Sequence, residues 1–306
     1  MRVAVIGAGA TGGYIGGKLA QAGNQVAIVD VGPQLAAIQK HGLRLKTHWG
    51  DFTARVQATD DPKQIGPVDL VLLALKTYHN EAVLPRLKPL FGKNTTLLSL
   101  QNGVDNYERI SVHVGKGRVI PGAFYIETTV EEPGVICQQG DVVRVVIGEA
   151  DGGETPRIRA IADALAAAGI ETEVAPSIQK ELWTKFLFVV TLAGVTSACR
   201  ALMKDVLPVP EVRELIIQVM REIESVARAR NVPLDSDVVD KTMAYVDRSA
   251  ADLLASMHMD LEHGRPMELE ALTGAVVRLG RECGVPAPAN SVIYAILKVH
   301  SRGKKP

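Results

Sequence analysis

A glycine-rich segment near the start of the chain has the residue types and spacing of a dinucleotide-binding loop. Gly7, Gly9 and Gly12 form the pattern GxGxxG directly after an apolar run and at the start of a helical pattern. In such a loop the first glycine allows a tight turn, the second lets the backbone approach a pyrophosphate, and the third lets the helix pack closely on the strand. The helix N-terminus, including Ala10 and Thr11, would supply amide donors and the positive end of the helix dipole for the phosphates. A glycine-rich turn without a ligand is the alternative interpretation.

Asp30 ends the second predicted strand, 18 residues after Gly12. A carboxylate at this position typically accepts hydrogen bonds from the adenosine ribose hydroxyls and repels a 2′-phosphate. No cation occurs in residues 31–33, so the local charge favours NAD(H) over NADP(H). Two alternatives stay open: the carboxylate caps the following helix, or Lys40 or Arg44 folds over a 2′-phosphate.

Three further polar residues stand where a cofactor or a substrate would need them. Lys76 and Asn102 each follow a predicted strand, and open α/β sheets bind ligands at the carboxyl ends of their strands. Lys185 lies in an apolar helical stretch, and residues 186–198 contain no other charge. This lysine therefore either faces a functional cleft or extends its amine into water along the helix surface.

Strands and helices alternate in the first half of the chain, which predicts a doubly wound, parallel sheet. The predicted strands are Arg2–Ile6, Gln25–Asp30, Leu43–Thr47, Phe52–Ala58, Val68–Leu75, Thr95–Leu100, Arg118–Ile126, Gly134–Gln138, Val142–Ile147 and Glu171–Val174. The predicted helices are Thr11–Ala22, Pro33–His41, His79–Leu90 and Glu154–Ala168.

The pattern changes after Pro176 to helical periodicity without a convincing strand. The predicted helices are Ser177–Ala198, Pro210–Arg230, Asp235–Asp247, Ala251–His263, Glu268–Cys283 and Pro288–Val299, with prolines as start or stop signals. The sequence thus predicts an α/β protein in two domains. Residues 1–175 form a dinucleotide-binding, Rossmann-like doubly wound domain, and residues 176–306 form an all-helical substrate and catalytic domain.

The composition argues against several classes of function. Among the 306 residues, 34 Lys and Arg balance 34 Asp and Glu, so the chain shows no electrostatic footprint for nucleic acid or an anionic membrane. Three cysteines lack metal or redox spacing, which indicates reduced thiols in a cytoplasmic protein. The longest apolar run, Leu70–Leu75, is too short to span a bilayer. His258 and His263 do not have metal-ligand spacing, so no metal is expected.

The motifs together resemble those of the ketopantoate reductases (2-dehydropantoate 2-reductases) over nearly the whole chain. The resemblance is carried by GAGATGG at residues 7–13, LKTYH at 75–79, QNG at 101–103, Trp-x-Lys at 183–185, Ser-Met-x-x-Asp at 256–260, Gly-Arg-x-x-Glu at 264–268, and Pro286 with Pro288. It implies a Rossmann domain followed by a helical domain, with the active site in the cleft between them. It also implies reduction of a 2-oxo acid with NADPH, as in pantothenate biosynthesis.

The resemblance assigns roles to single residues. Lys185 matches the family's catalytic lysine and Glu268 its active-site glutamate, whereas Asn102 matches the cleft asparagine, Ser256 the substrate-binding serine and Lys76 the lysine at a strand end. A protonated lysine would supply the proton and stabilise the developing alkoxide while the nicotinamide delivers hydride to the C2 carbonyl. A nearby carboxylate would keep that lysine charged, although a surface salt bridge is the alternative for the glutamate.

Two departures from the family pattern bear on cofactor and substrate. The family commonly has asparagines four and eight residues after the catalytic lysine, where this chain has Val189 and Ala193. A pocket without those amides tolerates a more apolar substrate. Asp30 stands where the family usually has an arginine for the NADPH phosphate. The alternatives are therefore an NAD-dependent D-2-hydroxyacid dehydrogenase of the same superfamily and, outside catalysis, a dinucleotide-binding protein. Lys185 and Glu268 argue against the second. The expected partner is a small 2-oxo acid, and the apolar helices suit either a monomer core or a homodimer.

Overall fold

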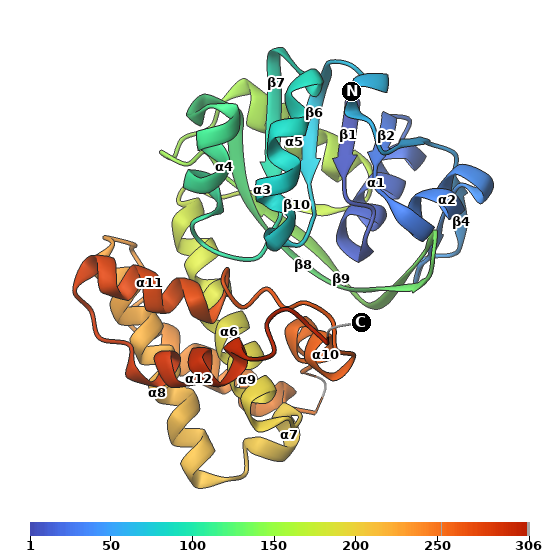
Figure 1. Cartoon of the computed structure of the whole chain (residues 1–306). Coiled ribbons are helices and arrows are strands. Elements are labelled where there is room, and N and C mark those ends of the chain that lie inside the picture. The colour runs from blue at the N-terminus through green and yellow to red at the C-terminus, as the bar shows by residue number, and fades with distance from the viewer. Residues whose placement is uncertain (252, 305–306) are drawn as a thin grey trace. The chain divides into compact units, whose positions relative to one another are not determined.

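The computed structural model describes residues 1–251 and 253–304, which fall into two compact units (Figure 1). The first unit comprises Met1–Gln101 and Asn106–Ile178. The second unit runs from Gln179 onwards and also includes the short segment Asn102–Asp105. The first is mixed α/β, and the described elements of the second are all helices, as the sequence predicts.

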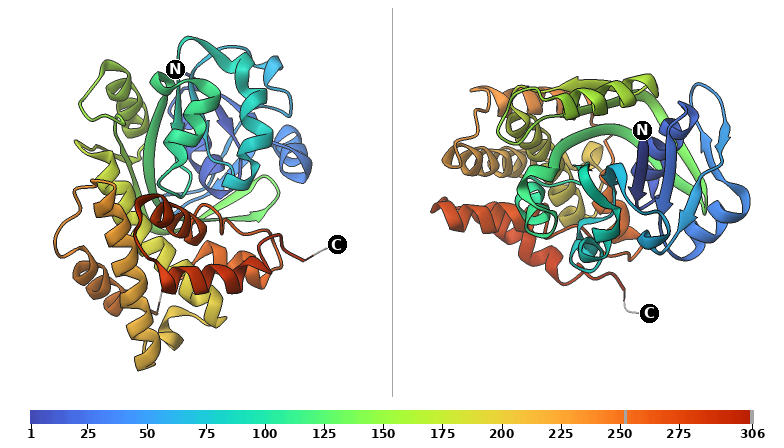
Figure 2. Two further views of the ribbon diagram at one scale, coloured as in Figure 1. Left: turned by 60° about the vertical axis from the view of Figure 1, so that its left-hand side comes forward. Right: turned by 90° about the horizontal axis from the view of Figure 1, so that it is seen from above.

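One ten-stranded sheet forms the centre of the first unit. Its parallel part consists, in sheet order, of β5 (Gln57–Thr59), β2 (Gln25–Val29), β1 (Arg2–Ile6), β6 (Val68–Leu73), β7 (Phe91–Ser99) and β8 (Val119–Glu132). The sheet continues through β9 (Val135–Ile147), which is antiparallel to β8, to β3 (Leu43–Lys46) and β4 (Phe52–Ala54). β10 (Glu171–Val174) pairs in parallel with β9. Figure 2 shows β8 and β9 as long, curved strands.

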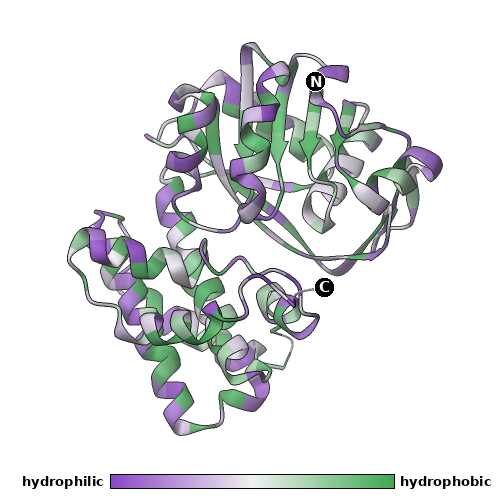
Figure 3. Cartoon of the chain, in the orientation of Figure 1, coloured by the Kyte–Doolittle hydropathy of each residue, from purple (hydrophilic) through white to green (hydrophobic). Residues whose placement is uncertain are grey.

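Apolar side chains cover both faces of the sheet, because alternate residues of a strand point to opposite faces. Val3 and Val5 pack in one cluster with residues of α1 (Ala10–Gln21) and α5 (Pro156–Ala167). Ala4 and Ile6 pack in another with the 3₁₀ helix Leu84–Leu90 and α4 (Asn106–Val114). The strands are therefore apolar along much of their length (Figure 3). Burial on both faces confirms the predicted doubly wound sheet.

The second unit contains seven helices among its described residues. They are α6 (Ile178–Cys199), α7 (Met203–Val206), α8 (Pro210–Ala229), α9 (Val238–Ser249), α10 (Ser256–Glu262), α11 (Thr273–Cys283) and α12 (Pro288–Lys298). By length and composition α6 could cross a membrane, but 67% of its most apolar window is buried. That burial fits a core helix of this unit.

Prolines explain one difference from the predicted elements. Residues 79–90 do not form one helix: α3 (Asn80–Val83) is a single turn, and Leu84–Leu90 continues as a 3₁₀ helix. Pro85 and Pro89 have no amide hydrogen to donate to an α-helical bond, so the α-helix cannot continue through them.

Several other boundaries were wrong. The segments 134–138 and 142–147 belong to one strand, β9, and the predicted strand Phe52–Ala58 is split into β4 and β5 on opposite edges of the sheet. The helix predicted from Ala251 begins at Ser256, and residue 252 lies outside the described residues. α11 begins at Thr273, which leaves Glu268 in the preceding turn. The helices α4 and α7 were not predicted.

A buried carboxylate joins two helices of the second unit. Glu222 of α8 is 8% exposed. Its carboxylate accepts hydrogen bonds from the Ala289 amide at 2.9 Å and from the amide and side chain of Asn290 at 3.0 and 2.8 Å. These amides open α12, so Glu222 satisfies donors that have no partner inside that helix.

We expect Glu222→Ala to lower the free energy of unfolding by about 2–4 kcal/mol, because it leaves several buried donors without an acceptor. The measurement is denaturant unfolding of the full chain followed by circular dichroism. Glu224→Ala on the same helix is the control, because its ion pair with Arg228 lies nearer the surface and should contribute under about 1 kcal/mol. Equal losses in the two variants would contradict this account of α12.

Candidate active site

The glycine loop lies between β1 and α1, and its three glycines have different local requirements. Gly7 has φ +90°, and a Cβ there would come within 2.7 Å of the Leu75 side chain. A Cβ at Gly12 would overlap the Gly7 carbonyl oxygen. A Cβ at Gly9 would meet no atom within 4 Å. The protein's own packing therefore explains Gly7 and Gly12, whereas Gly9 borders open space of the kind that a bound pyrophosphate would occupy.

The start of α1 fits an anionic ligand. Gly9 is the N-cap residue and offers no side-chain acceptor, and the first turn contains no acidic residue. Ala10 and Thr11 are partly exposed at this end. Amides at the start of a helix have no intrahelical acceptor, so a diphosphate can satisfy them.

Asp30 lies directly against this loop. Its Oδ2 accepts a hydrogen bond from the Ala8 amide at 2.5 Å, and its Oδ1 accepts one from the Val31 amide at 2.7 Å. The N-cap residue of α2 (Gly32–His41) is Val31, without a side-chain cap bond. The helix-capping alternative for Asp30 is therefore wrong, and its carboxylate is held beside the loop.

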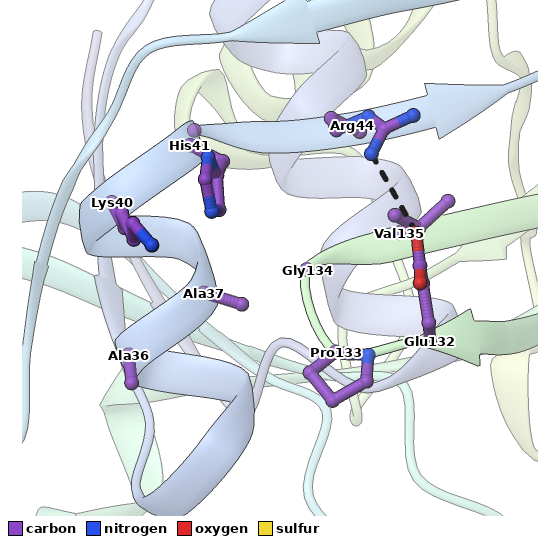
Figure 4. Close-up of a pocket in the computed structure, with 10 residues that line it drawn as sticks. Ala36, Ala37, Lys40, His41, Arg44, Glu132, Pro133, Gly134 and Val135 are labelled. Carbon is purple, nitrogen blue, oxygen red and sulfur yellow. Dashed lines mark ion pairs between the residues drawn. The ribbon is translucent and has the colours of Figure 1, made fainter.

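The two cations considered for a 2′-phosphate lie elsewhere on α2 and β3. Lys40 is eight residues into α2, about 12 Å along the helix axis from Gly32. Arg44 pairs with Glu132 at 3.6 Å. Both line a pocket of about 630 Å³ at the C-terminal end of the helix (Figure 4). Arg44 already has a carboxylate partner, and the carboxylate of Asp30 accepts its hydrogen bonds from two backbone amides.

Lys76 lies just beyond the carboxyl end of β6, in a turn that buried amides hold in place. The Gln101 side chain donates to the Leu75 carbonyl at 2.7 Å and to Asn80 Oδ1 at 2.7 Å, and Asn80 Nδ2 donates back to Gln101 Oε1 at 3.0 Å. This amide pair ties the turn that carries Lys76 to the end of β7. Gln101 belongs to the QNG motif, but its sequence position predicts no task for it, and no motif points to Asn80.

The second unit brings Lys185 and Glu268 close enough to interact electrostatically. Desolvation of the amine lowers the pKa of Lys185 from 10.5 to about 8, and the charge of Glu268 opposes that shift. Glu268 is only 6% exposed, so the surface salt-bridge alternative is wrong. A partly exposed lysine next to a buried carboxylate can exchange a proton near neutral pH.

The other predicted substrate contacts lie on separate elements of the second unit. Asn102 is partly buried, and Asp105, three residues later, pairs with Arg278 of α11 at 2.7 Å. Ser256 is exposed at the first position of α10. Val189 is partly buried, and Ala193 is 2% exposed one helical turn further along α6.

Residues 1–251 and 253–304 contain no group of three or more His, Cys, Asp or Glu side chains able to hold a metal ion.

Two family models cover most of the chain. The model described as ketopantoate reductase PanE/ApbA matches residues 3–152, and its C-terminal counterpart matches residues 177–301. The chain belongs to the ketopantoate reductase family. The motif resemblance noted from the sequence is thereby confirmed, and so is its assignment as an oxidoreductase. This family reduces 2-oxo acids to hydroxy acids with a nicotinamide cofactor.

Similar proteins extend over the whole chain. The 2-dehydropantoate 2-reductase of Mesorhizobium japonicum is 30% identical over 97% of each chain. The crystal structure of a PanE/ApbA family ketopantoate reductase from Ralstonia eutropha has a TM-score of 0.91 and 30% identity, covering 98% of each chain. D-mandelate dehydrogenase with NADH and anilino(oxo)acetate has a TM-score of 0.89 at 23% identity over 98% of each chain, a likeness of fold.

We expect Gly9→Val to weaken NADH binding by at least about a hundredfold, because the side chain would fill the space that the pyrophosphate needs. Its thermal unfolding midpoint should stay near that of the wild type, since the position is open. Gly12→Val is the matched comparison and should destabilise the first unit, since its side chain overlaps Gly7. If Gly9→Val bound NADH with undiminished affinity in a fluorescence titration, the loop would be a turn without a role in cofactor binding.

Proposed function

We propose that this ketopantoate reductase family member reduces an apolar 2-oxo acid with NADH, with Lys185 as the proton donor. The observation that carries the proposal is the electrostatic interaction of Lys185, on the apolar helix α6, with buried Glu268 in the segment before α11. A protein that only bound dinucleotide would gain nothing from a lysine with a lowered pKa in this setting. In this proposal residues 1–175 bind the dinucleotide, and residues 176–306 supply the catalytic groups.

Each residue has a definite task in the proposed reaction. The nicotinamide, when bound, supplies the hydride to the C2 carbonyl. Lys185 donates a proton to the carbonyl oxygen and stabilises its developing negative charge, and Glu268 favours the charged lysine. Asn102 and Ser256 hold the polar groups of the substrate, while Lys76 and Asn102 also contact the cofactor.

The surface around Lys185 supports a substrate with an apolar group at C3. Val189 follows the lysine by one helical turn and is partly exposed, whereas Ala193, one turn further, is buried; neither side chain offers a hydrogen-bond donor. Phe188 packs edge-on against Tyr245 of α9 with ring centroids 5.4 Å apart, which adds aromatic surface on α6. A substrate with a polar side group would leave that group unpaired against these residues.

A panel of branched, aromatic and hydroxylated 2-oxo acids, assayed with both NADH and NADPH, tests the substrate. 2-Dehydropantoate itself is the second candidate, favoured by the family. A cytoplasmic location and a homodimer stay predictions from the sequence.

We expect the rate of reduction to fall as the pH rises through about 8, because only the protonated Lys185 can donate. Glu268→Gln should move this basic limb to lower pH, since the charge that raises the pKa is gone. Lys185→Ala should lower turnover at least about a hundredfold and abolish the limb. Lys180→Ala is the control on the same helix, because Lys180 forms a partly exposed ion pair with Asp235. Near-normal turnover of Lys185→Ala would overturn the assignment.

We also expect the wild type to prefer NADH over NADPH by roughly tenfold to several hundredfold. Two like charges at short range in a partly shielded site repel by about 1–4 kcal/mol, and Asp30 places one of them at the ribose. Steady-state kinetics with both cofactors measures the ratio, and Asp30→Ala should reduce it. A wild type that prefers NADPH, or a ratio unchanged in Asp30→Ala, would show that the argument from this charge fails.

A further inference from the structure

We infer that Gln34 is a positioning residue that holds the glycine loop in the conformation that binds the dinucleotide. The inference rests on the proposed cofactor binding. Gln34 lies in the first turns of α2, and its Nε2 donates to the Ala8 carbonyl at 2.5 Å. Ala8 is fully buried inside the GxGxxG segment. No motif draws attention to this glutamine, because its contact spans 26 residues of sequence.

Ala8 is held from both sides of its backbone. Its amide donates to Asp30 Oδ2 at 2.5 Å, and its carbonyl accepts from Gln34 Nε2 at 2.5 Å. Two fixed points on one residue leave little freedom for the peptide that leads into Gly9. Rotation of this peptide would re-aim the amides that follow, which are the donors for the phosphates.

The side-chain amide of Gln34 is itself fixed in orientation. Its Oε1 accepts a hydrogen bond from the Gly134 amide at 2.9 Å, in the turn between β8 and β9. Gly134 has φ +81°, and a Cβ there would come within 3.0 Å of the Ala37 Cβ, so the turn packs directly on α2 (Figure 4). With Oε1 committed to Gly134, only the NH₂ group can face Ala8.

This arrangement connects three segments that are distant in sequence. Gln34 links the glycine loop to the β8–β9 turn, and Arg44 donates its backbone amide to the Gly134 carbonyl at 2.9 Å, which adds β3 to the same contact. The hydrogen bonds are local to the first unit, so they bear on cofactor binding and not on the chemistry at Lys185. Loss of the Gln34 side chain should therefore weaken dinucleotide binding without lowering the turnover number of the enzyme at saturating substrate and cofactor.

The test compares Gln34→Met and Gln34→Ala with matched changes at Gln39. Methionine has nearly the size of glutamine but cannot make either hydrogen bond. Gln39 lies on the same helix and donates to the Ala58 carbonyl at 3.0 Å, away from the loop. Dissociation constants for NADH and NADPH are measured by fluorescence titration, kinetic constants by steady-state assay, and folding by thermal unfolding.

We expect both Gln34 variants to raise the dinucleotide Kd and the cofactor KM about tenfold. The turnover number and the KM of the 2-oxo acid should stay within about twofold of the wild type, and the Gln39 variants should match the wild type in all four constants. A general loss of packing would instead lower the unfolding temperature at both positions without a selective rise in cofactor KM.

Two results would overturn the inference: a dinucleotide Kd unchanged in both Gln34 variants, or an equal rise in the Gln39 variants. Failure of the proposed function gives a different result. A wild type that binds dinucleotide but reduces no 2-oxo acid would refute the proposed reaction, and the Kd ratios would still decide the role of Gln34.

Discussion

The glycine face of α1 is the contact on which the first unit depends. Gly12 lies against the Gly7 carbonyl, Gly13 against Ile136 of β9, Gly16 against Val5 of β1 and Gly17 against a leucine of β3, each so closely that a Cβ would be crowded. One helix thereby packs on the parallel strands and on the antiparallel extension of the same sheet. Each glycine costs about 1 kcal/mol of helix propensity relative to alanine, and close packing offsets that cost. The same close packing of the helix on the sheet holds the N-terminus of α1 at the carboxyl end of β1.

The second unit depends on an electrostatic balance, because it desolvates the amine of Lys185 and buries the carboxylate of Glu268. Desolvation favours neutral Lys185, whereas Glu268 favours the charged form. Neither effect removes the other, and the amine is left with a pKa of about 8, which suits the proposed role of Lys185 as a proton donor under neutral conditions. An exposed lysine would hold its proton too tightly, and an unpaired buried one would lose it. The turn between α10 and α11 is therefore as important as α6, because it delivers the carboxylate.

The sequence predicts what local patterns determine. Continuous apolar runs such as Val68–Leu73 predict strands buried on both faces, and the spacing of the glycines predicts the loop that follows β1. Long-range pairing is different. β9 was seen as two segments because its middle, near Gly140, is polar and exposed at a bulge in the ladder with β8. Glu268 was placed inside a helix because the periodicity of α11 extends back into the turn.

The candidate site residues also divide into those that local sequence patterns reveal and those that only long-range contacts reveal. Catalytic candidates were found because a lone lysine in an apolar helix is conspicuous, and family motifs supplied the rest. Gln34, Asn80 and Gln101 act through hydrogen bonds to backbone or to one another across 21 to 26 residues. An amide side chain in sequence carries no sign of which partner it will meet. The partners of Gln34, Asn80 and Gln101 become visible only in the fold, because the fold brings strand ends and helix starts together.

Asp30 shows how closely cofactor choice and loop geometry are linked. An ionised carboxylate has about four acceptor positions, and the amides of Ala8 and Val31 use two of them. The remaining positions suit the hydroxyl donors of a ribose and not the oxygens of a phosphate. An arginine at this position would pair with a 2′-phosphate, but it would also leave the buried Ala8 amide facing a donor. To reverse the proposed NADH preference with an arginine at this position would therefore require another acceptor for the Ala8 amide, because Gln34 already uses its oxygen on Gly134.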